Sequence, residues 1–204
     1  MTLQRLWYAT FALLSVLIAL VSARAYFLPL PLVMPDMAHY AALVPLPLWG
    51  HLVFGPLALV LAPFQFATRL RAKRPRLHRA TGYVYAGSIL LAALSSLSLL
   101  PQFAGTTWAL TGFLVLAVLW IGCTATGIML AIRHRTARHR VWMLRSVALT
   151  FAAVTLRVMM APMMAAGWTV LQTYDVTAWA SWLINLAVVE VYLRRGAFRR
   201  MRLA

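Results

Sequence analysis

Six long apolar runs, separated by short polar loops, constrain this chain more than any other feature. Each run approaches the ~20 residues that a helix needs to cross ~30 Å of hydrocarbon. Inside a bilayer every backbone polar group must be bonded within the protein, so spanning segments of this length form helices. The sequence therefore predicts an all-α, polytopic membrane helix bundle with six transmembrane helices. We expect one transmembrane domain, residues 1–204, with spans at about 6–30, 48–68, 82–100, 107–132, 146–168 and 178–193.

The composition supports a membrane protein and excludes several classes of function. Hydrophobic residues make up 63% of the chain, and 19 lysines and arginines face only 3 acidic residues. A net charge of +16 would suggest nucleic acid in a soluble protein, but here the cations lie in loops between apolar runs, as topology signals do. We therefore expect membrane lipids, and no nucleic acid, as partners. Hydrolysis by paired carboxylates and magnesium-dependent phosphoryl transfer lack the acidic residues they need.

The loop charges divide the protein into two sides. One side contains Asp36 and Asp175 and no lysine or arginine, whereas the other contains all the basic loops. The positive-inside rule predicts that the basic side, with both termini, faces the cytoplasm of a bacterial inner membrane. The tail is expected to meet anionic lipid headgroups there. The basic side comprises Arg5, the cluster at 69–79, the segment 133–145, and Arg194, Arg195, Arg199, Arg200 and Arg202.

Two basic segments, RLRAKRPRLHRATGYVY at 69–85 and IRHRTARHRVWMLRS at 132–146, share an arrangement. Each combines a cluster of cations, a His-Arg pair and an apolar run, and we interpret them as matched loops of nearly equal length. They place His78 and His139 at the foot of the helices that follow. Matched histidines on two bundle helices are what a bis-imidazole haem or a shared metal requires. The alternative is that these histidines bind phosphate headgroups or cap their helices.

A separate site is expected at the outer end of the second span. His51 lies there, about one membrane thickness from His78 and His139, so it cannot share a ligand with them. It is a candidate ligand for an outer haem. Together with His39, Met34 and Met37 of the outer loop and the methionines of the fifth span, it is also a candidate copper(I) site. The proposed thioether ligands are Met159 and Met163, in the run Met159, Met160, Met163 and Met164, for which plain packing is the alternative.

Arg157 is placed near the middle of the fifth span, where a charge costs several kcal/mol unless it is compensated. Glu190 is expected to pair with Arg194 four residues later, which leaves Arg157 for an anionic or oxygen-bearing ligand. A haem propionate, a lipid phosphate and a quinone oxygen all fit, and the alternative is a structural arginine bonded to backbone carbonyls or Gln65. Arg24, near the outer end of the first span, either snorkels or holds an anion beside His51.

Several of these motifs together resemble a bacterial family of multi-pass membrane proteins that share a domain of unknown function. The resemblance covers about residues 48–160 and implies a membrane location without an activity. The family's histidine pattern is in turn similar to transmembrane b-type cytochromes and ferric-reductase-like bundles, which hold haem between helices. The motifs are His51 with Gly55, Pro63–Phe66, His78 and Arg79 followed by Gly82 and Tyr85, His139–Ser146, and Leu156 with Arg157.

We therefore expect a b-type haem protein that transfers electrons between a membrane quinol and a redox partner. In this hypothesis, His78, His139 and His51 ligate haem, and Arg157 and Arg24 hold propionates or a quinone. A cofactor-free membrane module that binds lipid or a partner protein is the alternative, and an outer copper site is the third hypothesis. No sequence motif identifies a catalytic residue.

Overall fold

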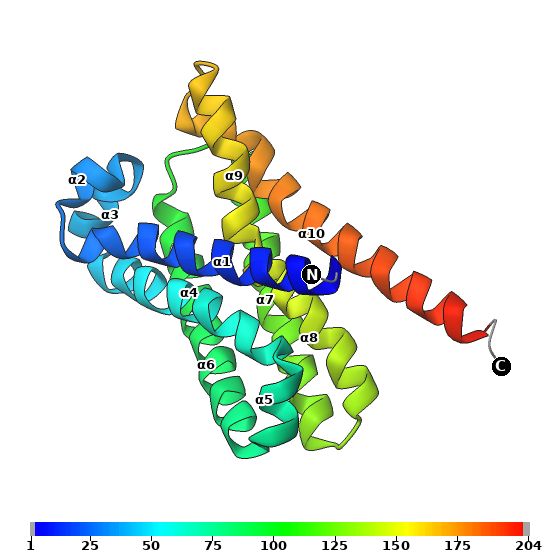
Figure 1. Ribbon diagram of the computed structural model, residues 1–204. Helices are drawn as coiled ribbons and strands as arrows, with labels where there is room; N and C mark the ends of the chain where they lie inside the picture. Colours follow the sequence, from blue (N-terminus) through cyan, green and yellow to red (C-terminus); the bar gives the residue numbers. More distant parts are fainter. Residues whose placement is uncertain (1–2, 202–204) are drawn as a thin grey trace. The chain divides into compact units, whose positions relative to one another are not determined.

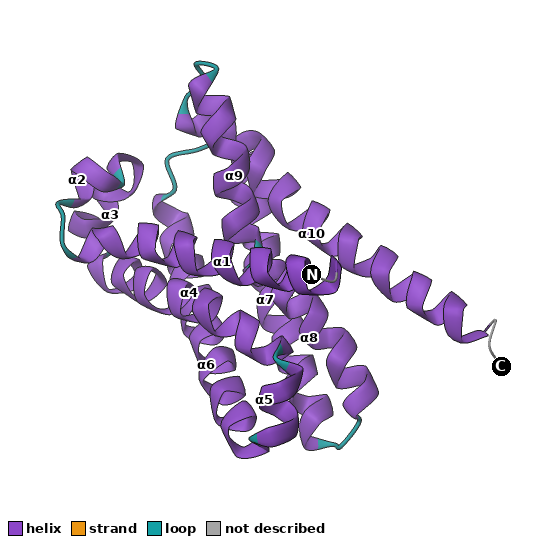
Figure 2. Cartoon of the chain, in the orientation of Figure 1, coloured by secondary structure: helices purple, strands orange, loops and turns teal. Residues whose placement is uncertain are grey.

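A computed structural model describes the backbone of residues 3–201 and the side chains of residues 5–195. Within this part of the chain the regular structure is entirely helical, with no strand, and short loops join the helices (Figure 2). Six helices or helix pairs are long and apolar enough to cross a membrane. The predicted all-α fold with six spans is therefore confirmed.

The main helices are α1 (Leu3–Ala23), α4 (Pro45–Phe66), α6 (Pro75–Leu99), α7 (Thr107–Ile132), α8 (Thr136–Thr150), α9 (Ala152–Ala165) and α10 (Val170–Met201). Helices α8 and α9 together form the fifth span, with a turn at Phe151 between them. The shorter helices are α2 (Leu30–Val33), α3 (Ala38–Leu43) and α5 (Thr68–Lys73), with 3-10 turns η1 (Arg24–Tyr26), η2 (Pro35–Met37) and η3 (Leu100–Gln102).

The helix ends differ from the predicted span ends in a consistent way. The third span was expected from residue 82 but α6 begins at Pro75, and the fifth was expected from 146 but α8 begins at Thr136. Hydropathy detects where side chains become apolar, whereas backbone hydrogen bonding continues into the polar interface. Proline at the first helical position also suits the start of α6, because its fixed φ is already helical.

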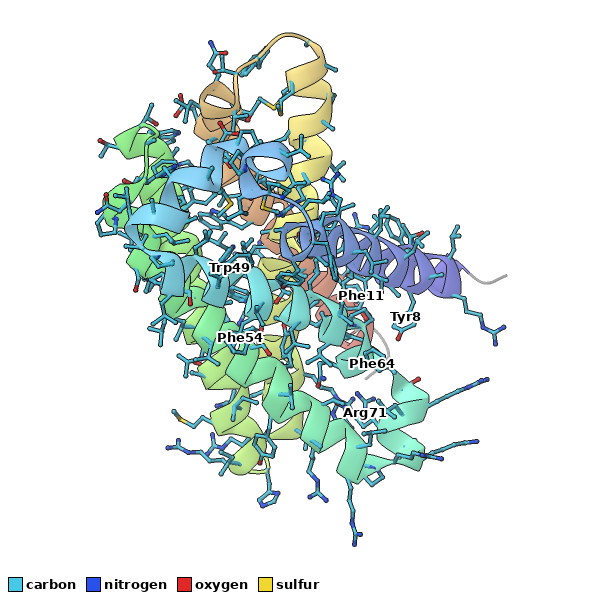
Figure 3. The ribbon with its side chains drawn as sticks, turned by 90° about the vertical axis from the view of Figure 1, so that its left-hand side faces the viewer. Tyr8, Phe11, Trp49, Phe54, Phe64 and Arg71 are labelled. Carbon is cyan, nitrogen blue, oxygen red and sulfur yellow. The ribbon has the colours of Figure 1, made fainter. Side chains whose placement is uncertain are left out.

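The helical packing contacts fall into two compact units, residues Met1–Ala104 and Gly105–Ala204. In the first unit, α1 packs against α4 and α4 packs along α6 (Figure 1). Figure 3 shows Tyr8 and Phe11 of α1 beside Phe64 of α4. The Tyr8 hydroxyl donates to the Pro63 carbonyl at 3.0 Å, and the Phe11 and Phe66 rings meet edge to face. The single domain expected from the sequence stays a prediction.

The proline-rich segment between the first two spans folds into α2, η2 and α3. Tyr40 and Leu30 from this segment are buried against Ala25, Leu48 and Leu52. Proline removes a backbone donor and restricts φ, so this segment forms three short helical pieces and not one continuous helix. The segment therefore covers one end of the first unit.

Proline in the middle of α4 leaves a backbone carbonyl without its usual donor. Pro56 has no N–H, so the Leu52 carbonyl, four residues earlier, loses its helical hydrogen bond. The Tyr26 hydroxyl donates to this carbonyl instead. A side chain from η1 thus satisfies the polar group that proline exposes, as a membrane interior requires.

In the second unit, α7 packs against α8, and α10 packs against α7, α8 and α9. Gly112 permits a close approach of α7 and α10, because a Cβ there would lie 2.9 Å from the Ala178 carbonyl oxygen. At the same end the Trp108 and Trp179 rings stack at 4.9 Å, and the Thr106 hydroxyl donates to the Asp175 carboxylate.

The basic tail was expected to lie at the cytoplasmic interface. The side chains of Arg194 and Arg195 are exposed at the end of the sixth span. The side chains of Arg199 and Arg200, and the whole of Arg202, lie outside the described residues.

Candidate functional site

His78 and His139 occupy equivalent positions at the start of their helices. Each is the fourth residue of its helix, α6 or α8. Each backbone N–H donates to the carbonyl of the arginine before the helix, Arg74 or Arg135. Both side chains are partly buried. The prediction that each histidine lies at the foot of the following helix is confirmed.

The loops that precede these histidines are not matched, contrary to the prediction. In the first, residues 67–74 separate α4 from α6 and include helix α5, whereas only residues 133–135 separate α7 from α8. The two segments resemble each other in their charges, but charge alone does not indicate that Thr68–Lys73 form a helix. His134 closes the second turn with a φ of 56°, a left-handed conformation suited to a tight reversal.

His139 is oriented by a hydrogen bond across the α7–α8 hairpin. Its Nδ1 lies 2.8 Å from the Gly127 carbonyl oxygen. Because a carbonyl only accepts, Nδ1 must carry the proton, and in the neutral ring the lone pair is then on Nε2. Gly127 also lets Met143 of α8 pack closely on α7, since a Cβ at position 127 would lie 2.7 Å from the Met143 sulfur. A backbone carbonyl that fixes the ring in this way is a common support for a metal-ligating histidine.

His78 belongs to the first unit and His139 to the second. A haem or metal shared by these two side chains therefore stays a prediction.

His51 lies on α4, facing α6. Its Nδ1 is 2.7 Å from the Ser96 hydroxyl and 3.4 Å from the Ala92 carbonyl oxygen. The two helices are close at this level, because a Cβ on Gly50 would collide with the Ser95 hydroxyl. The serine-rich stretch of α6 thus supplies the polar partner that an imidazole inside a span needs.

Glu190 pairs with Arg145, so the expected pairing with Arg194 is wrong. Arg145 Nε donates to one carboxylate oxygen at 2.6 Å and a terminal nitrogen donates to the other at 3.2 Å. The Arg145 guanidinium also lies over the Trp142 ring, 4.8 Å from its centroid. A bidentate pair between α8 and α10 gains more than an exposed contact along one helix, which explains the difference.

Arg157 lies in the second half of the fifth span, nearer its end than the middle position expected from the sequence. At ~1.5 Å per residue, it is ~32 Å of helix from the start of α8 at Thr136 and ~12 Å from the end of α9 at Ala165. Its Nη1 donates to the Ala153 carbonyl at 3.0 Å, so the side chain turns back along its own helix. Among the described side chains the one ion pair is Arg145 with Glu190, and Arg157 has no carboxylate partner.

The surroundings of Arg157 are aromatic and polar. The Tyr174 phenol of α10 is close enough to interact with its charge, and the Tyr174 ring meets Phe113 of α7 edge to face at 5.5 Å. On the same helix, the Thr155 hydroxyl donates to Asn185 of α10 at 2.9 Å. The one hydrogen-bond acceptor of this guanidinium among the described residues is thus a backbone carbonyl of its own helix, with the Tyr174 phenol of α10 near its charge.

Two of the other predicted ligands, Arg24 and His39, bond backbone carbonyls. Arg24 is exposed in η1 and donates to the Val21 carbonyl at 3.0 Å, which fits the snorkelling interpretation. His39 Nε2 bonds the Gln102 carbonyl at 3.0 Å. Met159 and Met163 are partly buried one turn apart on α9. His39 and His51 belong to the first unit and the methionines to the second, so the copper site stays a prediction.

No group of three or more histidine, cysteine or acidic side chains that could hold a metal occurs among the described residues. Sequence reasoning also missed the pairing of Arg145 with Glu190 and the bond from Ser96 to His51. Both depend on which helices are neighbours, and the sequence signal for the second was the run of serines at 95, 96 and 98 inside an apolar span.

Comparison with known proteins identifies the family. The family model for predicted membrane proteins of the type DUF2306 matches residues 48–193, which cover five of the six spans. No curated protein and no solved structure matches the chain, so these comparisons lend no support to the similarity with b-type cytochromes. The match includes all the motifs noted in the sequence, and the chain belongs to the DUF2306 family of predicted membrane proteins.

Proposed function

We propose that this protein binds a b-type haem at the basic end of its spans and transfers electrons in a bacterial inner membrane. The orientation of His139 carries the proposal. Its Nδ1 donates to the Gly127 carbonyl at 2.8 Å, which presents Nε2 as a ligand. His78, at the equivalent position of α6, is the proposed second residue that would hold the haem.

The charges near His139 fit the acidic groups of a haem. Arg135, Arg138 and Arg140 are exposed around the first turn of α8, where cations would pair with propionates. Arg157 is too distant for this role, because 18 residues separate it from His139, or roughly 27 Å of helix. The proposed propionate partners are therefore the interfacial arginines.

We assign Arg157 to a membrane quinone instead. A quinone brings carbonyl oxygens into the hydrocarbon, whereas a phospholipid phosphate stays at the headgroup level. The Arg157 guanidinium is held toward Ala153, deeper in its span, and not toward the interface. It would donate hydrogen bonds to a quinone oxygen, with Tyr174 close to the same charge.

The positions of these residues suggest a separate role for each. When bound, haem supplies one-electron chemistry. His139 and its Gly127 contact hold the ring in one tautomer, the arginines neutralise acidic groups, and Arg157 positions a lipophilic electron donor. Both termini and both basic loops would face the cytoplasm, as the charge asymmetry favours. The alternative is a cofactor-free module that binds lipid or a partner protein.

The test of haem binding is a dithionite-reduced minus oxidised visible spectrum of the full-length protein, purified from cells supplied with haem. We expect Soret and α-band changes in the wild type that are lost in His139→Ala and His78→Ala. His134→Ala is the matched control, because its side chain lies in the tight turn, and it should keep the spectrum. A flat wild-type spectrum would favour the cofactor-free module.

The quinone role has its own test. Arg157→Gln should keep the spectrum but need ~10–100 times more quinol for the same rate of haem reduction, since a charged hydrogen bond is worth about 1.5–3 kcal/mol. Arg24→Gln is the control, because Arg24 is exposed and bonded to its own turn. Equal quinol dependence in wild type and Arg157→Gln would remove the assignment.

A further inference from the structure

A pocket lies at the junction of α5 and α6, lined by Lys73, Arg74, Pro75, Arg76 and Leu77. Its three cations occupy four consecutive positions, and all three side chains are exposed. The one ion pair among the described side chains involves neither α5 nor α6. The pocket thus has a concentrated positive charge that no carboxylate neutralises.

The backbone at this junction adds to the positive potential. Arg74 ends α5 and precedes α6 with φ −136° and ψ 67°, a non-helical conformation that turns the chain sharply. Pro75 then begins a helix of 25 residues, whose N-terminal end carries a partial positive charge. The backbone N–H groups of Arg76 and Leu77 fall in the first turn, where helical geometry provides no acceptor.

The position of the pocket indicates what it binds. The second span ends at Phe66 and the third begins at Pro75, so the junction lies at the membrane interface, where lipid phosphates are found. Leu77, within the pocket lining, is 44% exposed, and Tyr83 and Val84, further along α6, are 62% and 51% exposed. A phosphate in the pocket would therefore have an apolar path for its acyl chains along α6.

Helix α5 is what distinguishes this junction from the other basic loop. Its sequence TRLRAK carries two more arginines, Arg69 and Arg71, within four residues of the pocket residue Lys73, and Figure 3 labels Arg71 on this helix. The second loop carries a similar number of cations but is a three-residue turn at 133–135. In the described part of the chain, no short helix precedes α8 in the way that α5 precedes α6 and packs against it.

We propose that the α5–α6 pocket is a specific binding site for the headgroup of an anionic phospholipid. Lys73, Arg74 and Arg76 bind the phosphate, the first-turn amides of α6 face it, and Leu77 contacts the start of an acyl chain. This inference is independent of haem, because none of these residues takes part in the proposed haem or quinone sites.

The experiment measures lipid binding to the full-length protein in neutral detergent. The delipidated protein is titrated with phosphatidylglycerol or phosphatidylcholine, and bound lipid is counted by native mass spectrometry. We expect a preference for phosphatidylglycerol. Each of Lys73→Gln, Arg74→Gln and Arg76→Gln should weaken its binding about fivefold, the value expected for one basic residue near a membrane surface.

The matched control is the triple variant Arg133→Gln, Arg194→Gln and Arg195→Gln, which removes the same charge from exposed positions outside the pocket. It should retain wild-type binding, whereas the triple variant at 73, 74 and 76 should lose it. Equal losses in both triple variants would show that general surface charge suffices and would overturn the proposal.

Two further results would also overturn it. One is displacement of the lipid by inorganic phosphate at an equal concentration, which would show that the pocket is a simple anion site. The other is unchanged phosphatidylglycerol binding in all three single variants. Each single variant removes only one charge, so this comparison holds even if the triple variant fails to fold.

Discussion

Single residues decide how the second unit tolerates charge inside the membrane. Arg145 and Glu190 neutralise each other between α8 and α10, while Arg157 is left with a backbone acceptor from its own helix. The chain has only three acidic residues. Because Glu190 pairs with Arg145, it does not neutralise Arg157. The unpaired guanidinium is therefore the residue for which a ligand is most expected.

We predict that Arg145→Gln destabilises the protein more than Arg194→Gln. The first change leaves Glu190 unpaired within the helix bundle, at a cost of ~1–2 kcal/mol, between the values for exposed and buried pairs. The second removes an exposed charge that lies one turn from Glu190 along α10. Thermal unfolding in detergent should show a lower midpoint for Arg145→Gln alone, and equal midpoints would argue against the pairing.

At the scale of helices, a glycine permits close helix packing, and a tyrosine hydroxyl satisfies a carbonyl that proline leaves without a donor. Gly112 and Gly122 both lie on α7, but of these two positions an added Cβ would meet another helix only at Gly112. Tyr26 reaches from η1 to the Leu52 carbonyl in α4. Each of these contacts joins two elements, so each can be tested by a change on one side.

We expect Gly112→Ala to cost ~1–3 kcal/mol, because the new Cβ would overpack against α10 backbone that cannot move aside. Gly122→Ala serves as its control, since nothing lies within 4 Å of a Cβ there. Helix propensity should make it neutral or up to ~1 kcal/mol stabilising. Unfolding of both variants in the same detergent gives the comparison, and a similar loss in both would contradict the close α7–α10 contact.

Tyr26→Phe should destabilise the first unit by ~1–3 kcal/mol, the cost of an unsatisfied buried acceptor. In a Pro56→Ala background the new N–H at position 56 restores the helical bond, so the same change should cost much less. A double-mutant cycle measured by thermal unfolding isolates this coupling. Additive effects would mean that Tyr26 does not substitute for the missing donor.

At the scale of the whole molecule, the spans were predictable and their neighbours were not. Apolar runs identify the helices because hydrocarbon excludes unbonded backbone. The starts at Pro75 and Thr136 were missed, because helical bonding does not depend on hydropathy. His78 and His139 were correctly placed at helix starts, whereas the partners of His51 and Glu190 required knowledge of which helices pack together.

The predicted topology can be tested with single cysteines in a Cys123→Ala background. Asp36→Cys should react with a membrane-impermeant thiol reagent added to whole cells, because the positive-inside rule places that loop outside. Ala72→Cys and Ala137→Cys, in the two basic segments, should react only after the cells are opened. The reverse pattern would invert the orientation and place the basic pocket on the outer face.

The measurement that tests the central claim most directly is the ratio of haem to protein after purification from haem-replete cells. We predict about one haem per chain in the wild type, from the ligand pair expected at the basic end. Gly127→Leu should lower the ratio together with His139→Ala, because it would displace the carbonyl that orients the ring, whereas His134→Ala should match the wild type. A wild-type protein without haem, or a His139→Ala variant with unchanged haem, would contradict the account.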